Sequence, residues 1–326
     1  MKKLFANHGR ELSALLAIAV MFVIFSLIDP IYYSGDNIRD IVEHATIYGL
    51  MGLGVTGIII SGAIDLSVGP ALAFIAVVVA RQAVSGVQPV YCVIIGIMIG
   101  FAMGLFNGFL VNHMRLQPFI ATMGTMSVFR GMAYLYTQAV PVIGVPRSYR
   151  LLVDGELFPF IRSSIIIFLG FALILHVLLK YTCFGNHVYA IGGNEEAARL
   201  SGVKVKYTRT MIYAIGMIGT ALAAIVQLGK LGTGDPTTGI GYELEAIAAA
   251  AIGGTSMAGG RGTVLGTVLG AILFSCLKVG LIVSGVDTFW QYVATGMVIV
   301  VSAYIEVLQA RLSAVPGGRR EGKAAH

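Results

Sequence analysis

Apolar runs close to the length of a membrane-spanning helix recur along the whole chain. A helix needs about 20 predominantly apolar residues to cross the hydrocarbon core of a bilayer. Ten segments approach that length, and they cover approximately residues 12–29, 44–61, 68–86, 89–111, 117–138, 163–180, 211–229, 243–258, 263–284 and 288–308. Charged residues make up 12% of the 326 residues, against roughly 25% in a soluble domain. The sequence therefore predicts an all-α, polytopic membrane protein with ten transmembrane helices.

Two of the ten segments are less regular than the others. The segments at 68–86 and 243–258 are short or polar at one end, so either could be broken or re-entrant. Non-helical backbone is tolerated inside a membrane only where protein or a water-filled cavity surrounds it.

The basic residues indicate an orientation. With the N-terminus in the cytoplasm, most lysines and arginines in the short loops fall on the inner side, and the first outer loop is acidic. We therefore expect both termini in the cytoplasm of a multi-pass protein. The net charge of +6 is then an orientation signal, which makes nucleic acid an unsuitable partner. Residues 1–310 form one expected permease domain, with a long cytoplasmic stretch at 181–210 and a basic tail at 311–326.

Two glycine patterns suggest an internal repeat. The fourth segment carries Gly96, Gly100, Gly104 and Gly108, and the ninth region carries Gly262, Gly266 and Gly270. Small residues at four-residue spacing let helices pack closely in lipid. The loops before the third and eighth segments also match, because each places glycines and an acid–leucine pair before a short apolar run. An inverted repeat of segments 2–5 and 7–10 would produce both matches, and coincidence among 42 glycines is the alternative.

The cytoplasmic stretch contains a short helical signal. Asn194 is a good N-cap, two acids follow it in the first turn, and Gly202 can end the helix. The candidate residues are Asn194, Glu195, Glu196, Ala197, Ala198, Arg199 and Gly202. Such a helix either docks a cytoplasmic partner or rests on the bilayer surface.

Several strings in order along the chain carry a family resemblance. Glu196-Ala197-Ala198 with Gly202 matches the EAA loop of ABC importer permeases. The other strings are Ser61-Gly62 with Asp65-Leu66-Ser67-Val68-Gly69, Phe119-Ile120-Ala121-Thr122 with Arg130-Gly131, Ala190 to Gly202, Gly241-Tyr242-Glu243-Leu244 with Gly253-Gly254-Thr255-Ser256, and Gly259-Gly260-Arg261-Gly262. Together they resemble the ribose-type sugar permeases of the branched-chain amino acid/ribose permease superfamily. The Ile-x-Leu-Pro tail of the widest EAA pattern is missing here, as it generally is in this sugar branch.

This resemblance implies a type II ABC importer in a bacterial inner membrane. It implies a homodimeric permease, a cytoplasmic ATPase pair and a periplasmic sugar-binding protein, with the helix at 194–202 seated in the ATPase. The sequence has no Gly-x-x-x-x-Gly-Lys-Ser/Thr loop. ATP and magnesium would therefore belong to the partner, and this chain would be a transport subunit without enzymatic activity, cofactor or metal.

Candidate residues for the transport path come from both the motifs and the charges. Asp65 and Ser67 could form an inner gate or cap the third segment, while Thr122 lies in a family motif. Arg130 is the deepest charge, and it is either a paired structural residue or part of the path. The stretch 231–242 is either an outer gate or an ordinary loop; its candidates are Asp235, Tyr242 and Glu243.

Three other functions are alternatives to a monosaccharide permease. One is a permease of the same superfamily for another small solute, such as a signalling furanose, a nucleoside or a branched-chain amino acid. Another is an ion-coupled carrier, which usually needs acids at mid-membrane; the acids here lie near segment ends. The third is an intramembrane enzyme, but the chain lacks a recognisable nucleophile–base motif or His/Cys cluster.

Overall fold

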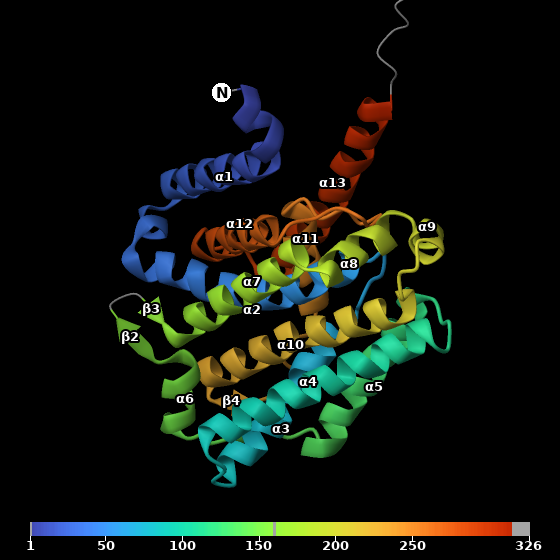
Figure 1. Cartoon of the computed structure of the whole chain (residues 1–326). Coiled ribbons are helices and arrows are strands. Elements are labelled where there is room, and N and C mark those ends of the chain that lie inside the picture. The colour runs from blue at the N-terminus through green and yellow to red at the C-terminus, as the bar shows by residue number, and fades with distance from the viewer. Residues whose placement is uncertain (1, 159–160, 315–326) are drawn as a thin grey trace, which may run out of the picture.

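The computed structural model describes residues 2–158 and 161–314, which are almost wholly helical (Figure 1). The helices are α1 (Lys2–Ile28), α2 (Gly35–Ile60), α3 (Val68–Val84), α4 (Pro89–Asn112), α5 (Pro118–Thr137), α6 (Arg147–Asp154), α7 (Ser163–Tyr181), α8 (Cys183–Gly193), α9 (Glu195–Leu200), α10 (Val205–Leu231), α11 (Tyr242–Ile252), α12 (Val264–Val283) and α13 (Thr288–Ala314), with a 3-10 turn η1 (Pro30–Tyr33). Each of the ten predicted segments coincides with a helix, so the all-α prediction is confirmed. Helices α6, α8 and α9 lie in the connections.

In the part of the chain that the structure describes, two pairs of very short strands lie within the connections. They are β1 (Val142–Ile143), β2 (Glu156–Phe158), β3 (Ile161–Arg162) and β4 (Thr233–Gly234). Strand β1 pairs antiparallel with β4, and β2 pairs antiparallel with β3. The first pair ties the connection after α5 to the connection after α10.

Local sequence signals set many helix ends. The Ser34 side chain accepts a hydrogen bond from the backbone N–H of Asn37 at the start of α2, and Thr263 does the same for Gly266 at the start of α12. Pro89 occupies the first position of α4, where a missing N–H costs nothing. Gly232 ends α10 with a φ of 67°, a left-handed conformation that glycine adopts freely.

Among the described residues, five helices are long and apolar enough to cross a membrane, namely α2, α4, α7, α10 and α12. Within their most apolar windows, α2 is 94% buried and α10 is 78% buried, whereas α4 is 28% and α7 is 33% buried. Helices α2 and α10 therefore form the centre of the bundle. The outer helices expose large apolar side chains, such as Met98 on α4 and Ile174 on α7, as expected for contact with lipid.

Helix α11 is too short to cross a membrane alone. Its 11 residues rise about 16 Å at 1.5 Å per residue, roughly half of a 30 Å hydrocarbon core. Helix α3, with 17 residues, is preceded by the non-helical residues 61–67. The two irregular segments of the sequence thus correspond to helices that begin after loops inside the bundle.

The packing of the two halves follows one pattern. Helix α2 packs on α11 and α12, while α10 packs on α3 and α4. Helix α5 packs on α3, and α13 packs on α11. Exchanging α2, α3, α4 and α5 with α10, α11, α12 and α13 reproduces these contacts, which supports the predicted inverted repeat.

The contacts of α2 with α10 show this exchange at single residues. A Cβ placed on Gly54 would collide with the carbonyl of Gly216, and one placed on Gly216 would lie 2.7 Å from the carbonyl of Gly54. The start of α3 and the loop before α11 show a second reciprocal contact, because a Cβ on Gly69 would meet the carbonyl of Gly239 and one on Gly239 would lie 2.6 Å from the carbonyl of Gly69. A pseudo-twofold axis therefore passes close to both glycine pairs.

The neighbouring contacts keep the same symmetry. Gly57, three residues after the crossing in α2, faces the side chain of Ile212. Gly219, three residues after the crossing in α10, faces the carbonyl of Leu50. Since Leu50 and Ile212 each lie four residues before the crossing glycine of their own helix, the two contacts are equivalent.

The predicted glycine stripes pack closely, but they are not equivalent. In α4, Gly100 and Gly104 approach the α10 backbone, Gly108 approaches Thr210, and Gly96 approaches Val79 and Ile225. In α12, Gly266 and Gly270 approach the α11 segment at Gly253 and Ala249, while Gly262 precedes the helix and faces Ile60. One stripe meets α10 and the other meets α11. The inverted repeat is therefore visible in the crossing of α2 and α10. The two stripes share their spacing, but they pack against helices that are not equivalent in the repeat.

The two ends of the bundle differ in what they carry. Helix α9 lies at one end, and α6 with β2 and β3 lies at the opposite end (Figure 1). We call these the α9 end and the α6 end. Helix α13 extends to Ala314, so the first four residues of the predicted tail are helical; residues 315–326 lie outside the described part of the chain.

Candidate functional site

Helix α9 is a capped, exposed element at the α9 end. The Asn194 Oδ1 accepts a hydrogen bond from the Ala197 backbone N–H at 2.9 Å, which starts the helix. Gly202, with a φ of 86°, closes the turn that follows. The helix covers six residues, Glu195–Leu200, shorter than the predicted 194–202 because its last residues form the turn.

One face of α9 is buried and the opposite face is free. Ala198 packs with Ile191 and Val205 in a small apolar cluster, whereas Leu200 remains 78% exposed. The Arg199 guanidinium donates two hydrogen bonds to the Glu196 carboxylate, at 2.6 and 2.9 Å. These bonds raise the pKa of Arg199 above its usual value. The exposed face therefore carries a leucine beside an ion pair, a surface suited to a protein contact.

Arg209, in the first turns of α10, connects α9 to the end of α2. Its Nη2 lies 2.7 Å from the Glu195 Oε2 and 3.2 Å from the carbonyl oxygen of Ser61. Arg209 is 12% exposed and Glu195 is 56% exposed. Arg209 was not among the residues predicted from the sequence, because its two partners lie far from it along the chain.

The backbones of three segments meet beside this contact. The Gly260 N–H donates to the Ile60 carbonyl at 2.9 Å. Gly192, at the end of α8, approaches Ile60 and Gly260 so closely that a Cβ would collide with the Ile60 carbonyl. Gly259 packs against Gly62 in the same way. We call Ile60, Gly62, Gly192, Gly259 and Gly260 the glycine joint; it joins α8 to the end of α2 and to the loop after α11.

Asp65 and Ser67 lie in a fully buried cluster. The Asp65 Oδ1 accepts hydrogen bonds from the Ser67 N–H at 2.8 Å and from the Ser67 hydroxyl at 2.7 Å. The Asn107 amide donates to the Asp65 Oδ2 at 3.1 Å and to the Ser67 Oγ at 2.8 Å. All three residues are 0% exposed. Asp65 organises the turn that begins α3, and Asn107, from α4, is a member that the sequence did not reveal.

Arg130 fastens the loop that leads into α11. Its Nη1 donates to the carbonyls of Pro236 at 2.6 Å and Thr238 at 2.8 Å. Asp235 instead accepts from the N–H and hydroxyl of Thr237 at 2.7 Å, which forms a local turn. Because Arg130 lies in the middle of α5, the loop at 232–241 enters the bundle.

The start of α11 lies against the start of α3. The buried Glu243 carboxylate lies so close to Gly69 that a Cβ on this glycine would collide with it. The Tyr242 ring packs edge-on against Tyr48 of α2, with centroids 5.3 Å apart. Thr122 lies apart from this group, and its hydroxyl donates to the Pro118 carbonyl of its own helix at 2.9 Å. The structure thus brings Tyr242 and Glu243 to the meeting of two helix starts.

A partly buried ion pair adjoins Tyr242. The Lys278 Nζ lies 2.6 Å from the Glu245 Oε1 and 2.6 Å from the Tyr48 hydroxyl. It also lies 4.7 Å from the centre of the Tyr48 ring. The pair links α12, α11 and α2. Glu245 lies near the end of its apolar segment, yet it is buried because α11 begins inside the bundle.

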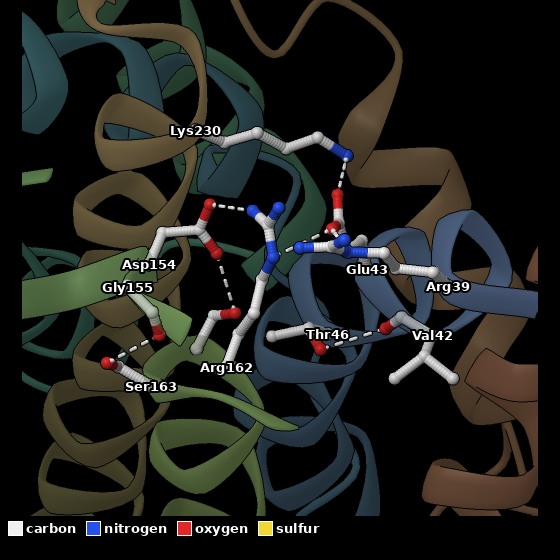
Figure 2. A network of polar contacts seen from close by, with 10 residues as sticks. Arg39, Val42, Glu43, Thr46, Asp154, Gly155, Arg162, Ser163 and Lys230 are labelled. Atoms are coloured by element: carbon white, nitrogen blue, oxygen red, sulfur yellow. Dashed lines mark hydrogen bonds and ion pairs between the residues drawn. The ribbon is translucent and has the colours of Figure 1, made fainter. Parts of the chain in front are cut away.

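A charge network closes the α6 end (Figure 2). One Glu43 oxygen lies 3.1 Å from Arg162 and 3.3 Å from Arg39, and the other lies 2.8 Å from Lys230. Arg162 also pairs with Asp154 at 2.6 Å. The sequence indicated that these residues lie close together. The predicted topology places the acidic first loop and these cations on the same side of the membrane.

Metal-ligating side chains do not gather anywhere in the described ranges, 2–158 and 161–314. No group of three or more His, Cys, Asp or Glu side chains there could hold a metal ion. Cys92 and Cys276 are buried and Cys183 is exposed, and none of the three forms a disulfide.

Known proteins resemble this chain over most of its length. It is 40% identical over 299 residues to the ribose import permease protein RbsC of Bacillus subtilis, covering 91% of this chain and 92% of the relative. It is 33% identical over 304 residues to RbsC of Escherichia coli K12, covering 91% and 93%. It is 32% identical over 326 residues to the galactose/methyl galactoside import permease protein MglC of Escherichia coli K12, covering 94% and 97%. No solved structure gives a significant match.

A family model extends the same result. The model described as branched-chain amino acid transport system / permease component matches residues 37–303. This range runs from the start of α2 into α13, so it includes both halves of the repeat, the glycine joint and α9. The chain therefore belongs to the branched-chain amino acid transport system / permease component family.

Proposed function

We propose that this chain is the membrane-spanning subunit of an ATP-driven importer for a monosaccharide. The observation that carries the proposal is helix α9: a capped helix with an exposed Leu200 and an exposed Glu196–Arg199 ion pair lies at one end of a bundle of membrane-spanning length. Relatives at 32–40% identity are named for ribose and galactose import. Both names denote monosaccharides, which sets the proposed substrate class.

In this proposal, α9 seats in a cytoplasmic ATPase that carries the ATP and magnesium. The α9 end is then cytoplasmic, both termini are cytoplasmic, and the membrane is the bacterial inner membrane. The chain itself is no enzyme and holds no cofactor or metal. A periplasmic sugar-binding protein docks at the α6 end, and a second copy of the permease completes the transporter.

The path in this proposal runs past the two loops that precede α3 and α11. Asp65 and Ser67 lie in the loop nearer the α9 end, while Arg130, Asp235, Tyr242 and Glu243 lie around the other loop. Thr122 lies on the intervening α5. The start of α3 and the loop before α11 meet at Gly69 and Gly239, so movement of either changes the passage between them. Physically, alternating access needs such a pair of gates around one site.

Purification from native membranes tests the proposal. A tagged chain is extracted in mild detergent, its partners are identified by mass spectrometry, and the complex is placed in liposomes with labelled ribose or galactose. We expect a stoichiometric ATPase subunit and uptake that needs both ATP and the binding protein. A partner-free chain that moves solute without ATP would contradict the proposal. ATP-driven uptake of a branched-chain amino acid but of no sugar would contradict its substrate class.

A further inference from the structure

Arg209 occupies an unusual position between an exposed helix and a buried loop. From one nitrogen, Nη2, it donates to the Glu195 carboxylate on α9 and to the Ser61 carbonyl at the end of α2. Since a guanidinium is planar and rigid, its two partners hold a fixed relative position. A displacement of Glu195 therefore changes the hydrogen bond at Ser61.

The segment that follows Ser61 is held by the same face of α10. Tyr213 lies one helical turn after Arg209, and its hydroxyl donates to the Ile64 carbonyl at 2.9 Å. The next residue, Asp65, belongs to the buried cluster with Ser67 and Asn107. Residues 61–67 are thus fixed to α10 at two carbonyls before they enter the start of α3.

The glycine joint makes this connection stiff. Gly192, next to the α9 N-cap region, touches the backbone of Ile60 with no side chain between them. The Ile60 carbonyl also accepts the Gly260 N–H. Helices α8 and α9 therefore cannot shift without moving the end of α2 or breaking these backbone contacts. Beside these backbone contacts, Arg209 makes a side-chain hydrogen bond to the Ser61 carbonyl.

We propose that Arg209 is the positioning residue that couples α9 to the loop at 61–67, so that the position of the docked ATPase sets the opening of the path ahead of α3. The inference rests on the proposed function and deepens it by naming how one partner regulates the path. It requires the guanidinium to hold both Glu195 and Ser61. If Arg209 only attached α9 to α10, the ion pair with Glu195 would be sufficient.

The test uses the complete transporter with its ATPase and binding protein in liposomes. Arg209→Met removes both hydrogen bonds and keeps an unbranched side chain. We expect the ATPase to remain bound at wild-type stoichiometry while sugar transported per ATP falls about tenfold or more. Lys180→Met is the control, because it removes an exposed cation from the last turn of α7, and it should keep wild-type coupling. Wild-type coupling in Arg209→Met would overturn the proposal.

Two further variants separate coupling from folding. Glu195→Gln changes a side chain that is 56% exposed, so folding is spared, and coupling should fall by about fivefold or more. The double exchange Glu195→Arg/Arg209→Glu restores the ion pair but leaves no donor for the Ser61 carbonyl, because a carboxylate only accepts. We expect this exchange to remain uncoupled. Recovery of uptake by the exchange would overturn the proposal, because it would show that the ion pair between α9 and α10 is sufficient.

Thiol labelling of a cysteine in the loop at 61–67 measures directly how accessible this loop is. Leu66→Cys, in a Cys183→Ser background, is labelled by a thiol reagent with and without ATP and vanadate. We expect labelling to depend on nucleotide with Arg209 present and to become independent of nucleotide in Arg209→Met. Labelling that still follows nucleotide in Arg209→Met would overturn the proposal. If the wild-type chain binds no ATPase at all, the proposed function itself fails, which is a distinct result.

Discussion

Lys278 and Glu245 form a partly buried ion pair in which Nζ lies 2.6 Å from Oε1, and the Tyr48 hydroxyl lies at the same distance from Nζ. Side-chain exposure is 21% for Lys278 and 9% for Glu245. Removing one member leaves the other charge buried without its partner, which typically costs about 3–5 kcal/mol. Lys278→Met should therefore lower the unfolding temperature in detergent markedly, as measured by a thermal scan.

The double variant Lys278→Met/Glu245→Gln is the control for that prediction. It removes both charges, so no uncompensated ion remains, and its unfolding temperature should lie above that of Lys278→Met. Equal unfolding temperatures for the single and double variants would show that the pair is not coupled.

The α2–α10 crossing predicts opposite effects for one substitution at two sites. In Gly216→Ala, the new Cβ would lie 2.7 Å from the Gly54 carbonyl, so the backbones must separate, at a cost of about 1–3 kcal/mol. Gly170→Ala on α7 meets no atom within 4 Å and should stabilise the helix by up to about 1 kcal/mol. Thermal scans of both variants in the same detergent would measure the difference. A tolerated Gly216→Ala would contradict the close crossing.

The end of α9 depends on a left-handed residue. Gly202 has a φ of 86°, and its N–H donates to the Arg199 carbonyl at 3.0 Å. Proline has φ near −65° and no N–H, so Gly202→Pro should abolish ATPase binding and uptake while the chain remains in the membrane. Reversing both charges at Glu195 and Glu196 should have the same outcome. Immunoblots of membranes and co-purification of the ATPase provide the measurements.

Gly144→Ala is the matched control at the other end of the bundle. Gly144 has a φ of 88°, and at Gly144, as at Gly202, an added Cβ would meet no atom within 4 Å. Gly202→Ala and Gly144→Ala thus carry the same backbone strain, of about 1–3 kcal/mol. Only Gly202→Ala should weaken ATPase binding; equal weakening by both would assign the effect to general strain.

Arg130 is expected to control the loop at 232–241. Arg130→Met leaves the Pro236 and Thr238 carbonyls without their charged donor, at about 1.5–3 kcal/mol for each bond. Limited proteolysis should cut this loop faster, and uptake should fall. Arg130→Lys retains a cation that can reach a carbonyl, so it should recover part of both. Unchanged proteolysis in Arg130→Met would contradict the fastening role.

The network at Glu43 predicts a dependence on salt. Glu43→Gln leaves Arg39, Arg162 and Lys230 facing one another without their shared carboxylate, so the variant should unfold at a lower temperature than the wild type. All three cations are partly exposed, and salt screens their repulsion. The difference between variant and wild type should therefore shrink as salt is raised. A difference that is constant in salt would contradict this electrostatic origin.

The positions of the membrane segments could be predicted from sequence because hydropathy is a local property. All ten segments match helices, and the two irregular ones match the helices that follow the loops at 61–67 and 232–241. The capped helix at 194–202 was also predictable, because Asn194 and its two following acids are adjacent in sequence. Helix α8 was not predicted, since it lies in a connection and carries no long apolar run.

The partners of the candidate residues could not be predicted, because they come from distant helices. Asn107 joins Asp65 across 42 positions, and Arg209 joins Ser61 across 148 positions. The glycine stripes predicted close packing but not the partner helix, since spacing alone does not say which neighbour a face meets. In the sequence, Glu243 and Glu245 lie near the end of an apolar segment, which places them at its periphery. They are buried because α11 begins inside the bundle.

The crossing of α2 and α10 also has a mechanical consequence. Gly54 lies near one end of α2, about 9 Å from Ile60 and about 28 Å from Gly35 along the helix. A rigid rod that turns about this fulcrum moves its long arm about three times as far as its short arm, and in the opposite direction. Glu43 lies about 16 Å from Gly54 along the helix, so the same turn would move the Glu43 network about twice as far as Ile60. The off-centre position of Gly54 therefore divides α2 into two arms of unequal length.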